Sequence, residues 1–268
     1  MRIVDVGSGP PLVMIPGIQG RWEWMKPAVD ALARRCRVIS FSLADEPSSG
    51  GRFDEKNGFA SYVAQVAEAM DQAGIEQAAI CGVSYGGLIA ASFAVQHPER
   101  TSALILVSAL PPGWRPNERA DFYLRAPRLL TPLFMLASLR LYGEIAAAQA
   151  SVAFGPVAAA RHAFNALRHM FSPTRMARRV RLVPPSDLTT DLCRLNKETL
   201  VILGEDRLDR VVPPSLTREY LAICPHAEVV TLARTGHLGL ITRADEFARI
   251  VGSFVERSTA REPRRRIG

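Results

Sequence analysis

Apolar runs alternate with amphipathic stretches along most of the chain. The short runs are rich in Val, Ile and Leu without strict alternation, which is typical of strands buried on both faces of a parallel sheet. The longer stretches carry apolar residues at helical spacing, as Tyr62, Val66, Ala69 and Met70 show. Strands that alternate with such helices predict an α/β protein, with a mostly parallel central sheet flanked by helices.

The pattern gives bounds for individual elements. Gly74 and Pro98, which follow the second and third expected helices, are residues that commonly follow a helix end. The expected strands are 2–6, 12–15, 37–42, 78–81, 103–107, 199–203 and 228–232. The expected helices are 24–34, 59–73, 86–96, 214–223 and 244–256.

The strand–helix rhythm stops at Pro111-Pro112 and resumes near Pro184-Pro185. The residues between are rich in Ala, Leu, Met and Arg, which is a helical composition. We therefore interpret 113–185 as a helical cap (lid) inserted after strand 103–107 into a core made of 1–112 and 186–256. Two further segments have little apolar content: we expect the polar loop 45–58 to be mobile and the basic tail 257–268 to be disordered.

Ser84 is the first candidate for chemistry. It lies in Gly82-Val83-Ser84-Tyr85-Gly86, which fits G-x-S-x-G with an expected strand before it and a helix after it. Glycine at 82 and 86 removes the Cβ atoms that would collide across a tight strand-to-helix turn. The motif predicts a nucleophilic serine; the alternative is an ordinary glycine-rich turn.

A nucleophilic serine needs a base, and five histidines compete for the role. His237 follows the last expected strand, in Thr235-Gly236-His237-Leu238-Gly239, at the edge of the sheet where sites gather in this architecture. The other four fit structural or surface positions better. These are His97, His162, His169 and His226.

The base in turn needs an orienting carboxylate, and three acids follow strand 199–203: Glu205, Asp206 and Asp209. Asp209 is preferred because Arg-Val-Val-Pro and a helix start follow it. Asp206 lies closer to the strand end and stays open, as does Glu205. The two that are not used would be solvated loop charges.

The chain order Ser84, Asp209, His237 resembles that of the serine-triad α/β-hydrolase superfamily, and the resemblance covers nearly the whole chain outside the cap and tail. The Asp-Arg-Val-Val-Pro run is similar to the family's usual continuation after its catalytic Asp. However, Gly204 at the strand end lies five residues before Asp209, where three is commoner, and this keeps Asp206 open. The resemblance implies an α/β-hydrolase fold.

The resemblance also implies an oxyanion hole made of two backbone N–H groups. One belongs to Tyr85, directly after the nucleophile. The other is expected from Ile18 in Pro16-Gly17-Ile18-Gln19-Gly20, where Pro16 replaces the family's usual His. Gln19 is an alternative donor, and a plain turn is the alternative to a hole.

The expected reaction is hydrolysis of a small-molecule carboxylic ester through an acyl-enzyme, and this chemistry requires no metal or organic cofactor. Carbon–carbon bond hydrolysis, perhydrolysis and acyl transfer can use the same triad, and a ligand-sensing protein can retain it. Apolar residues of the cap suggest an acyl pocket, although packing of the cap explains most of them. The residues we assign to the pocket are Gln19, Leu133, Phe134 and Leu238.

The positive charge of the chain is concentrated in two segments. The net charge is +7, but residues 113–185 hold eleven Arg and three acids, and the tail is basic as well. The rest of the chain is therefore mildly acidic, which is not the pattern of a nucleic-acid-binding protein. The Arg excess suggests an anionic substrate or peripheral contact with an anionic membrane surface, and an exposed charged face explains it as well.

The four cysteines are scattered without a CxxC pair, so we expect free thiols and no metal site. No secretory signal is visible, and the longest apolar stretch, 129–139, is broken by Pro132 and too short to span a bilayer. We therefore expect a soluble, cytoplasmic protein without a transmembrane segment. Nothing in the sequence indicates an oligomeric state.

Overall fold

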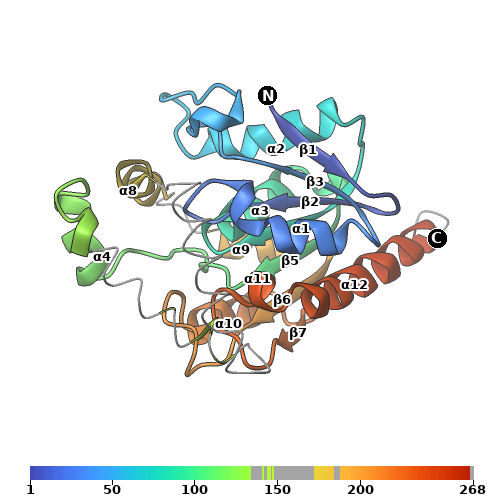
Figure 1. Cartoon of the computed structure of the whole chain (residues 1–268). Coiled ribbons are helices and arrows are strands. Elements are labelled where there is room, and N and C mark those ends of the chain that lie inside the picture. The colour runs from blue at the N-terminus through green and yellow to red at the C-terminus, as the bar shows by residue number, and fades with distance from the viewer. Residues whose placement is uncertain (134–140, 142–143, 146, 148–171, 184–187, 266–268) are drawn as a thin grey trace.

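The structure, a computed structural model, describes residues 1–133, 141, 144–145, 147, 172–183 and 188–265. Its centre is a seven-stranded sheet in the order β1-β3-β2-β4-β5-β6-β7 (Figure 1). β1 pairs antiparallel with β3, and all the other pairs are parallel. The strands are β1 (Ile3–Val6), β2 (Pro11–Ile15), β3 (Arg37–Phe41), β4 (Ala78–Val83), β5 (Thr101–Val107), β6 (Glu198–Leu203) and β7 (Glu228–Thr231).

Helices and short 3-10 turns connect these strands. In chain order they are η1 (Trp22–Met25), α1 (Lys26–Leu32), η2 (Pro47–Ser49), α2 (Ala60–Gln72), α3 (Tyr85–Gln96), η3 (Pro98–Arg100), α4 (Glu118–Arg125), α8 (Pro173–Arg181), α9 (Thr189–Arg194), α10 (Pro214–Ile223), α11 (Gly239–Thr242) and α12 (Ala244–Arg265). All seven expected strands are present, and the expected α/β class is confirmed. Four of the five expected helices form over most of their expected residues, and the first is divided between η1 and α1.

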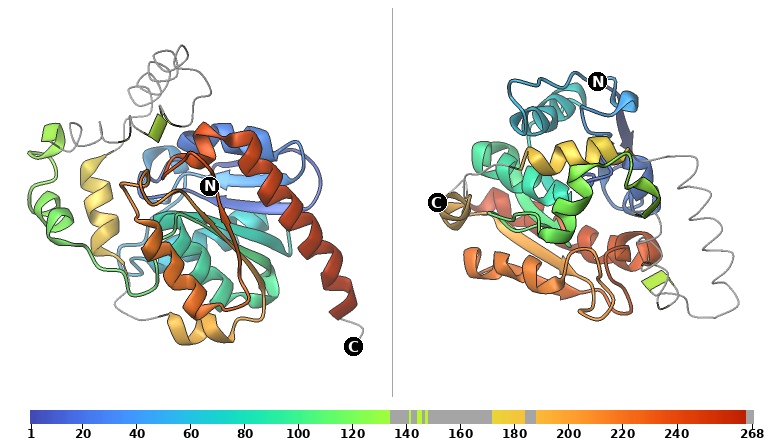
Figure 2. Two further views of the ribbon diagram at one scale, coloured as in Figure 1. Left: turned by 90° about the horizontal axis from the view of Figure 1, so that it is seen from below. Right: turned by 90° about the vertical axis from the view of Figure 1, so that its left-hand side faces the viewer.

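Two apolar layers bury the sheet because successive strand residues point to opposite faces. Val13 and Ile15 of β2 face α2, α3 and α10 in one layer. Leu12 and Met14 of the same strand face α1 and α12 in the other. Figures 1 and 2 show α1 and the long α12 packed together on this second face. Burial on both faces explains why the central strands lack polar alternation.

The loop that follows β3 is not the solvated segment that its composition predicts. Glu46 and Ser49 are buried, the side chain of Asp45 is 1% exposed, and the Ser49 hydroxyl donates to the carbonyl oxygen of Ala44. Two of these three side chains are acids that pair with arginines of α8, so polar residues are buried here through ion pairing. The expectation of a mobile loop is wrong for this first part of 45–58.

α12 continues to Arg265, into the segment for which the composition predicts disorder, and does not end near Glu256. Two contacts hold the added turns. Arg257 pairs with Glu228 of β7, and the buried hydroxyl of Ser258 donates to Glu198 at the start of β6. Side chains that leave the helix toward the sheet thus stabilise a segment whose composition alone predicts disorder.

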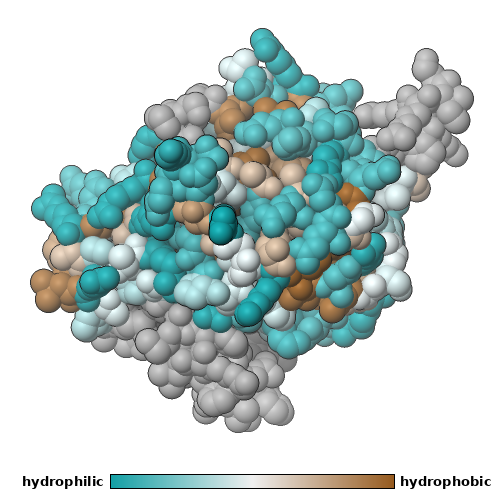
Figure 3. Space-filling model, turned by 90° about the horizontal axis from the view of Figure 1, so that it is seen from above, coloured by the Kyte–Doolittle hydropathy of each residue, from teal (hydrophilic) through white to brown (hydrophobic). Residues whose placement is uncertain are grey.

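The inserted segment (113–185) lies between β5 and β6 in the chain. Its described helices, α4 and α8, lie beside one another at one side of the core (Figures 1 and 2). Phe134, expected in the pocket, lies outside the described residues, as do His162 and His169. The face seen in Figure 3 is largely hydrophilic with smaller hydrophobic areas between. Within the described residues, no helix has the length and apolar content needed to cross a membrane.

Candidate active site

Ser84 occupies a strained turn between β4 and α3. Its backbone angles are φ 54° and ψ −118°, a region that residues with a Cβ seldom adopt. A Cβ at Gly82 would lie 2.3 Å from the carbonyl oxygen of Gly86, and a Cβ at Gly86 would lie 2.5 Å from that of Pro16. Only glycine fits at both places, so the G-x-S-x-G spacing has the steric origin that the sequence predicts.

The loop after β2 lies directly against this turn. A Cβ at Gly17 would lie 3.3 Å from the Cβ of Ser84, so the two backbones are in close contact. Residues 17–20 form a turn in which the Gly20 N–H donates to the Gly17 carbonyl oxygen over 2.9 Å. Ile18 and Gln19, the two candidate oxyanion donors of this loop, are the central residues of that turn. Tyr85, the other candidate, is the first residue of α3.

A buried arginine of the inserted segment holds this turn from outside. Arg179 of α8 is fully buried, and its Nη1 donates to the carbonyl oxygen of Ile18 over 2.7 Å. Its guanidinium also pairs with Asp45 and Glu46, each at 2.6 Å. Two carboxylates and a carbonyl oxygen therefore satisfy a cation that is removed from water, as burial of a charge requires.

Asp209 and His237 are brought together by the loops after β6 and β7. The distance from His237 Nδ1 to Asp209 Oδ2 is 3.3 Å, and both side chains are largely buried. The other oxygen, Oδ1, accepts the N–H groups of Val211 and Val212 at 3.0 and 2.9 Å. These two backbone donors fix the carboxylate, so that one oxygen remains directed at the imidazole.

The competing acids are engaged elsewhere. Asp206 is exposed and pairs with Arg218, whose guanidinium lowers the pKa of this carboxyl. Glu205 accepts the backbone N–H of Arg234 and pairs with Arg207, and the pKa of Glu205 is lowered by both contacts, mostly by the first. Among the three acids after β6, Asp209 is therefore the one that reaches His237.

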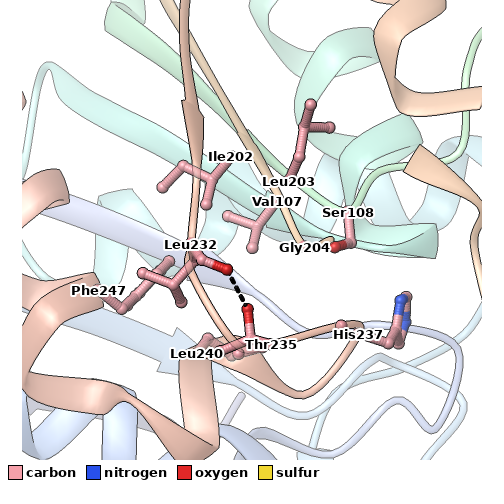
Figure 4. Close-up of a pocket in the computed structure, with 12 residues that line it drawn as sticks. Val107, Ser108, Ile202, Leu203, Gly204, Leu232, Thr235, His237, Leu240 and Phe247 are labelled. Carbon is pink, nitrogen blue, oxygen red and sulfur yellow. Dashed lines mark hydrogen bonds between the residues drawn. The ribbon is translucent and has the colours of Figure 1, made fainter. Parts of the chain in front are cut away.

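Glycines allow the loops after β6 and β7 to approach each other closely. A Cβ at Gly236 would lie 2.6 Å from the backbone nitrogen of Asp209, and one at Gly204 would lie 2.6 Å from Gly236. Below the loops is a small cavity whose lining includes Val107, Ser108 and His237 (Figure 4). Thr235 and Leu232 also line it, and the Thr235 hydroxyl donates to the Leu232 carbonyl oxygen over 2.8 Å.

The other residues considered for the pocket or for the base differ in how exposed they are and where they lie. Leu238 follows His237 and is partly buried, as Gln19 is, whereas Leu133 of the inserted segment is 45% exposed. His97 packs against Phe93 at the end of α3. His226 is exposed in the loop before β7.

Glu144 of the inserted segment is a site residue that the sequence analysis missed. It is 1% exposed, and its Oε1 accepts the N–H groups of Gly236 and Leu238, the residues on either side of His237. Burial raises the pKa of Glu144 to about 7, partly offset by these two N–H groups and by the charge of His237. The one available signal was a lone acid between apolar neighbours, Leu141 and Ile145.

Among the residues that the structure describes, no cluster of three or more His, Cys, Asp or Glu could hold a metal ion. Cys36 and Cys81 are buried free thiols, and burial raises their pKa values to about 11 and about 12. Both are therefore protonated at neutral pH and unreactive.

The sheet order, the strained serine and the Asp–His pair define the α/β-hydrolase class. The family model described as "alpha/beta hydrolase fold" matches residues 10–244, and the chain belongs to this family. The chain is 28% identical to the pimeloyl-[acyl-carrier protein] methyl ester esterase of Aliivibrio salmonicida, over 93% of this chain and 94% of that one. It is 29% identical to a 2-hydroxymuconate semialdehyde hydrolase of Pseudomonas putida, over 83% and 76% respectively.

Solved structures agree on the fold. The enol-lactonase from Burkholderia xenovorans superposes with a TM-score of 0.76 at 19% identity, over 95% of this chain and 96% of that one. An esterase from Exiguobacterium antarcticum superposes with a TM-score of 0.75 at 18% identity, over 95% and 94%. Together with the family match, these relatives show a hydrolase whose predicted superfamily and fold class are confirmed.

Proposed function

We propose that the chain is a serine hydrolase that cleaves carboxylic esters through an acyl-enzyme, with Ser84 as nucleophile, His237 as base and Asp209 as the acid of the triad. The observations that carry this proposal are the 3.3 Å contact between His237 Nδ1 and Asp209 Oδ2 and the strained backbone of Ser84. The loops of all three residues leave the carboxyl edge of the parallel strands. Active sites of open α/β sheets lie at this edge.

In the proposed reaction His237 takes the proton of the Ser84 hydroxyl while Oγ attacks the ester carbonyl carbon. The carbonyl oxygen becomes an oxyanion, which accepts hydrogen bonds from the backbone N–H groups of Ile18 and Tyr85. His237 then protonates the leaving alcohol, and the acyl group remains on Ser84. Water, deprotonated by His237, releases the acid and restores the serine. Asp209 holds the imidazole tautomer and stabilises the imidazolium.

A neutral, apolar acyl group suits the charges of the site better than an anionic one. Each described arginine of α8 is already engaged within the protein. Arg175 and Arg179 pair with buried Glu46, Arg178 pairs with Glu55, and Arg181 donates to the carbonyl oxygen of Leu124. The Arg excess of this helix therefore serves intramolecular pairing, and we propose a small-molecule ester of small to medium acyl length as the substrate of a cytoplasmic enzyme.

Hydrolysis of p-nitrophenyl esters from acetate to decanoate tests the proposal. We expect the wild type to turn over one part of this series, and Ser84→Ala to lose on the order of a millionfold in kcat. The matched variant Ser92→Ala removes another buried hydroxyl, from the middle of α3, and should remain active. Wild-type activity that persists in Ser84→Ala, or no activity on any ester, contradicts the proposal.

Hydrolysis of a carbon–carbon bond is the second candidate, because the Pseudomonas putida relative is a 2-hydroxymuconate semialdehyde hydrolase. The same triad and oxyanion donors serve that reaction class. Incubation with 2-hydroxymuconate semialdehyde separates the two candidates. Turnover of this compound with a kcat/KM well above that for every ester would favour carbon–carbon cleavage, and the reverse ratio would favour the esterase.

A further inference from the structure

The turn that carries His237 is held by a side chain from another part of the chain. Glu144 lies in the inserted segment, 93 residues before His237, and its carboxylate is buried against the turn. A single oxygen, Oε1, accepts the Gly236 N–H over 2.8 Å and the Leu238 N–H over 2.5 Å. The backbone is thereby fixed on both sides of the histidine.

Among the described residues, Glu144 is the acceptor that the structure gives both N–H groups. The turn lies between β7 and α11, where it forms no sheet ladder, and Gly236 is packed against the backbone of Leu208 and Asp209. A buried N–H group that loses its acceptor is costly, so a turn without Glu144 would rearrange to find another acceptor. Such a rearrangement would move the base.

From these contacts we infer that Glu144 is a positioning residue: by holding the two backbone amides beside His237, it fixes the direction in which the imidazole is presented to Ser84 and Asp209. The inference rests on the proposed role of His237 as the base. It makes the inserted segment part of the catalytic machinery and not only a wall of the substrate pocket. Glu144 does not touch the substrate in this role.

The charge of Glu144 gives a second effect that can be separated from the first. The titratable groups that act on its carboxylate are His237, whose positive charge favours ionisation, and Asp209, whose negative charge opposes it. Loss of the charge and loss of the acceptor can therefore be tested separately.

Three substitutions distinguish geometry from charge. Glu144→Gln retains an oxygen that can accept both N–H groups and loses the charge. Glu144→Asp retains the charge but is one methylene shorter, so that it cannot reach both amides from the same backbone position. Glu144→Ala removes both. Glu118→Gln, in the exposed first turn of α4, is the matched control for loss of a carboxylate from the inserted segment.

The first measurement is steady-state kinetics on the best p-nitrophenyl ester. We expect kcat to fall about a hundredfold in Glu144→Ala and Glu144→Asp, with KM little changed, because a misplaced base slows the chemical step. Glu144→Gln should retain most of kcat, because its amide oxygen can still accept both N–H groups. Glu118→Gln should behave as the wild type. Wild-type kcat in Glu144→Ala would overturn the inference.

The second measurement does not depend on activity. Amide hydrogen exchange at Gly236 and Leu238, followed by NMR, should be slow in the wild type and Glu144→Gln and fast in the Asp and Ala variants. If the wild type hydrolyses no ester, the proposed function fails, and exchange still decides whether the turn is held. If Glu144→Ala does not fold, Glu144→Asp decides. Unchanged exchange in the Asp variant would overturn the inference.

Discussion

Arg179 and Ile18, 161 residues apart in the chain, are joined by a 2.7 Å hydrogen bond from the guanidinium to the carbonyl oxygen. This oxygen belongs to the peptide group between Ile18 and Gln19, at the centre of the turn that lies against Ser84. The same guanidinium neutralises Asp45 and Glu46 after β3. One side chain of α8 thus links the inserted segment, the loop after β3 and the proposed oxyanion donor.

Replacement of Arg179 should destabilise the protein. Arg179→Met leaves the carboxylate of Asp45 without its cation and Glu46 with Arg175 alone, and we expect the free energy of unfolding to fall by about 3–5 kcal/mol. Urea unfolding measures the change. Arg34→Met, which removes an exposed arginine paired with Asp245, is the control and should change stability little. Equal effects of the two substitutions would show that burial of the Arg179 cluster is unimportant.

Arg179→Lys tests the link to the oxyanion turn. Lysine keeps the positive charge, but its single ammonium cannot bond both carboxylates and the Ile18 carbonyl oxygen with the planar geometry of a guanidinium. We expect a smaller loss of stability than in Arg179→Met, together with a fall of about tenfold or more in kcat for ester hydrolysis. A fully active lysine variant would indicate that the turn keeps its position without this bond.

Asp209 and Asp206 can be told apart by replacement with asparagine. In Asp209→Asn the amide oxygen can still accept the N–H groups of Val211 and Val212, but the His237 tautomer is no longer favoured. We expect kcat to fall on the order of ten-thousandfold. Asp206→Asn breaks an exposed pair with Arg218 and should leave kcat unchanged. The reverse result would transfer the role of triad acid to Asp206.

The strain at Ser84 should be measurable as stability. A residue held at φ 54° and ψ −118° costs about 1–3 kcal/mol, and glycine removes this cost because it lacks a Cβ. Part of the gain is offset by the greater freedom of glycine in the unfolded chain, by up to about 1 kcal/mol. We therefore expect Ser84→Gly to be about 1 kcal/mol more stable than Ser84→Ala in urea unfolding. Both variants lack the hydroxyl, so the comparison isolates the backbone.

The sequence was informative wherever a local pattern determines the structure. The strands could be placed because burial on both faces requires continuous Val, Ile and Leu, and the turn at Ser84 because only glycine fits at positions 82 and 86. Asp209, which the sequence favours over Asp206, contacts His237, whereas Asp206 pairs with Arg218; the role of triad acid stays a prediction.

The errors share a different physical origin. Asp45 and Glu46 appear solvated in a polar loop, and Glu144 appears as one charge in an alanine-rich segment. All three are buried because partners from distant elements satisfy them: Arg179 for the first two, and two backbone N–H groups for the third. A charge is buried only when its partner is in place, and no local pattern gives the position of a partner more than 90 residues away.

The raised pKa of Glu144 predicts how stability depends on pH. Its pKa rises from 4.5 to about 7 on folding, so the folded chain holds this proton over a range where the unfolded chain has released it. Its contribution to stability is therefore fully present below about pH 4.5 and is lost as the pH rises through about 7. The shift corresponds to at most about 3 kcal/mol.

Glu144→Gln cannot titrate, so its stability does not contain this pH-dependent contribution. Urea unfolding at pH 5 and pH 8 should show the wild type losing more stability than Glu144→Gln over that interval. Glu118→Gln should lose as much stability as the wild type between these two pH values. If Glu144→Gln also loses as much as the wild type, Glu144 ionises with an ordinary pKa in the folded protein.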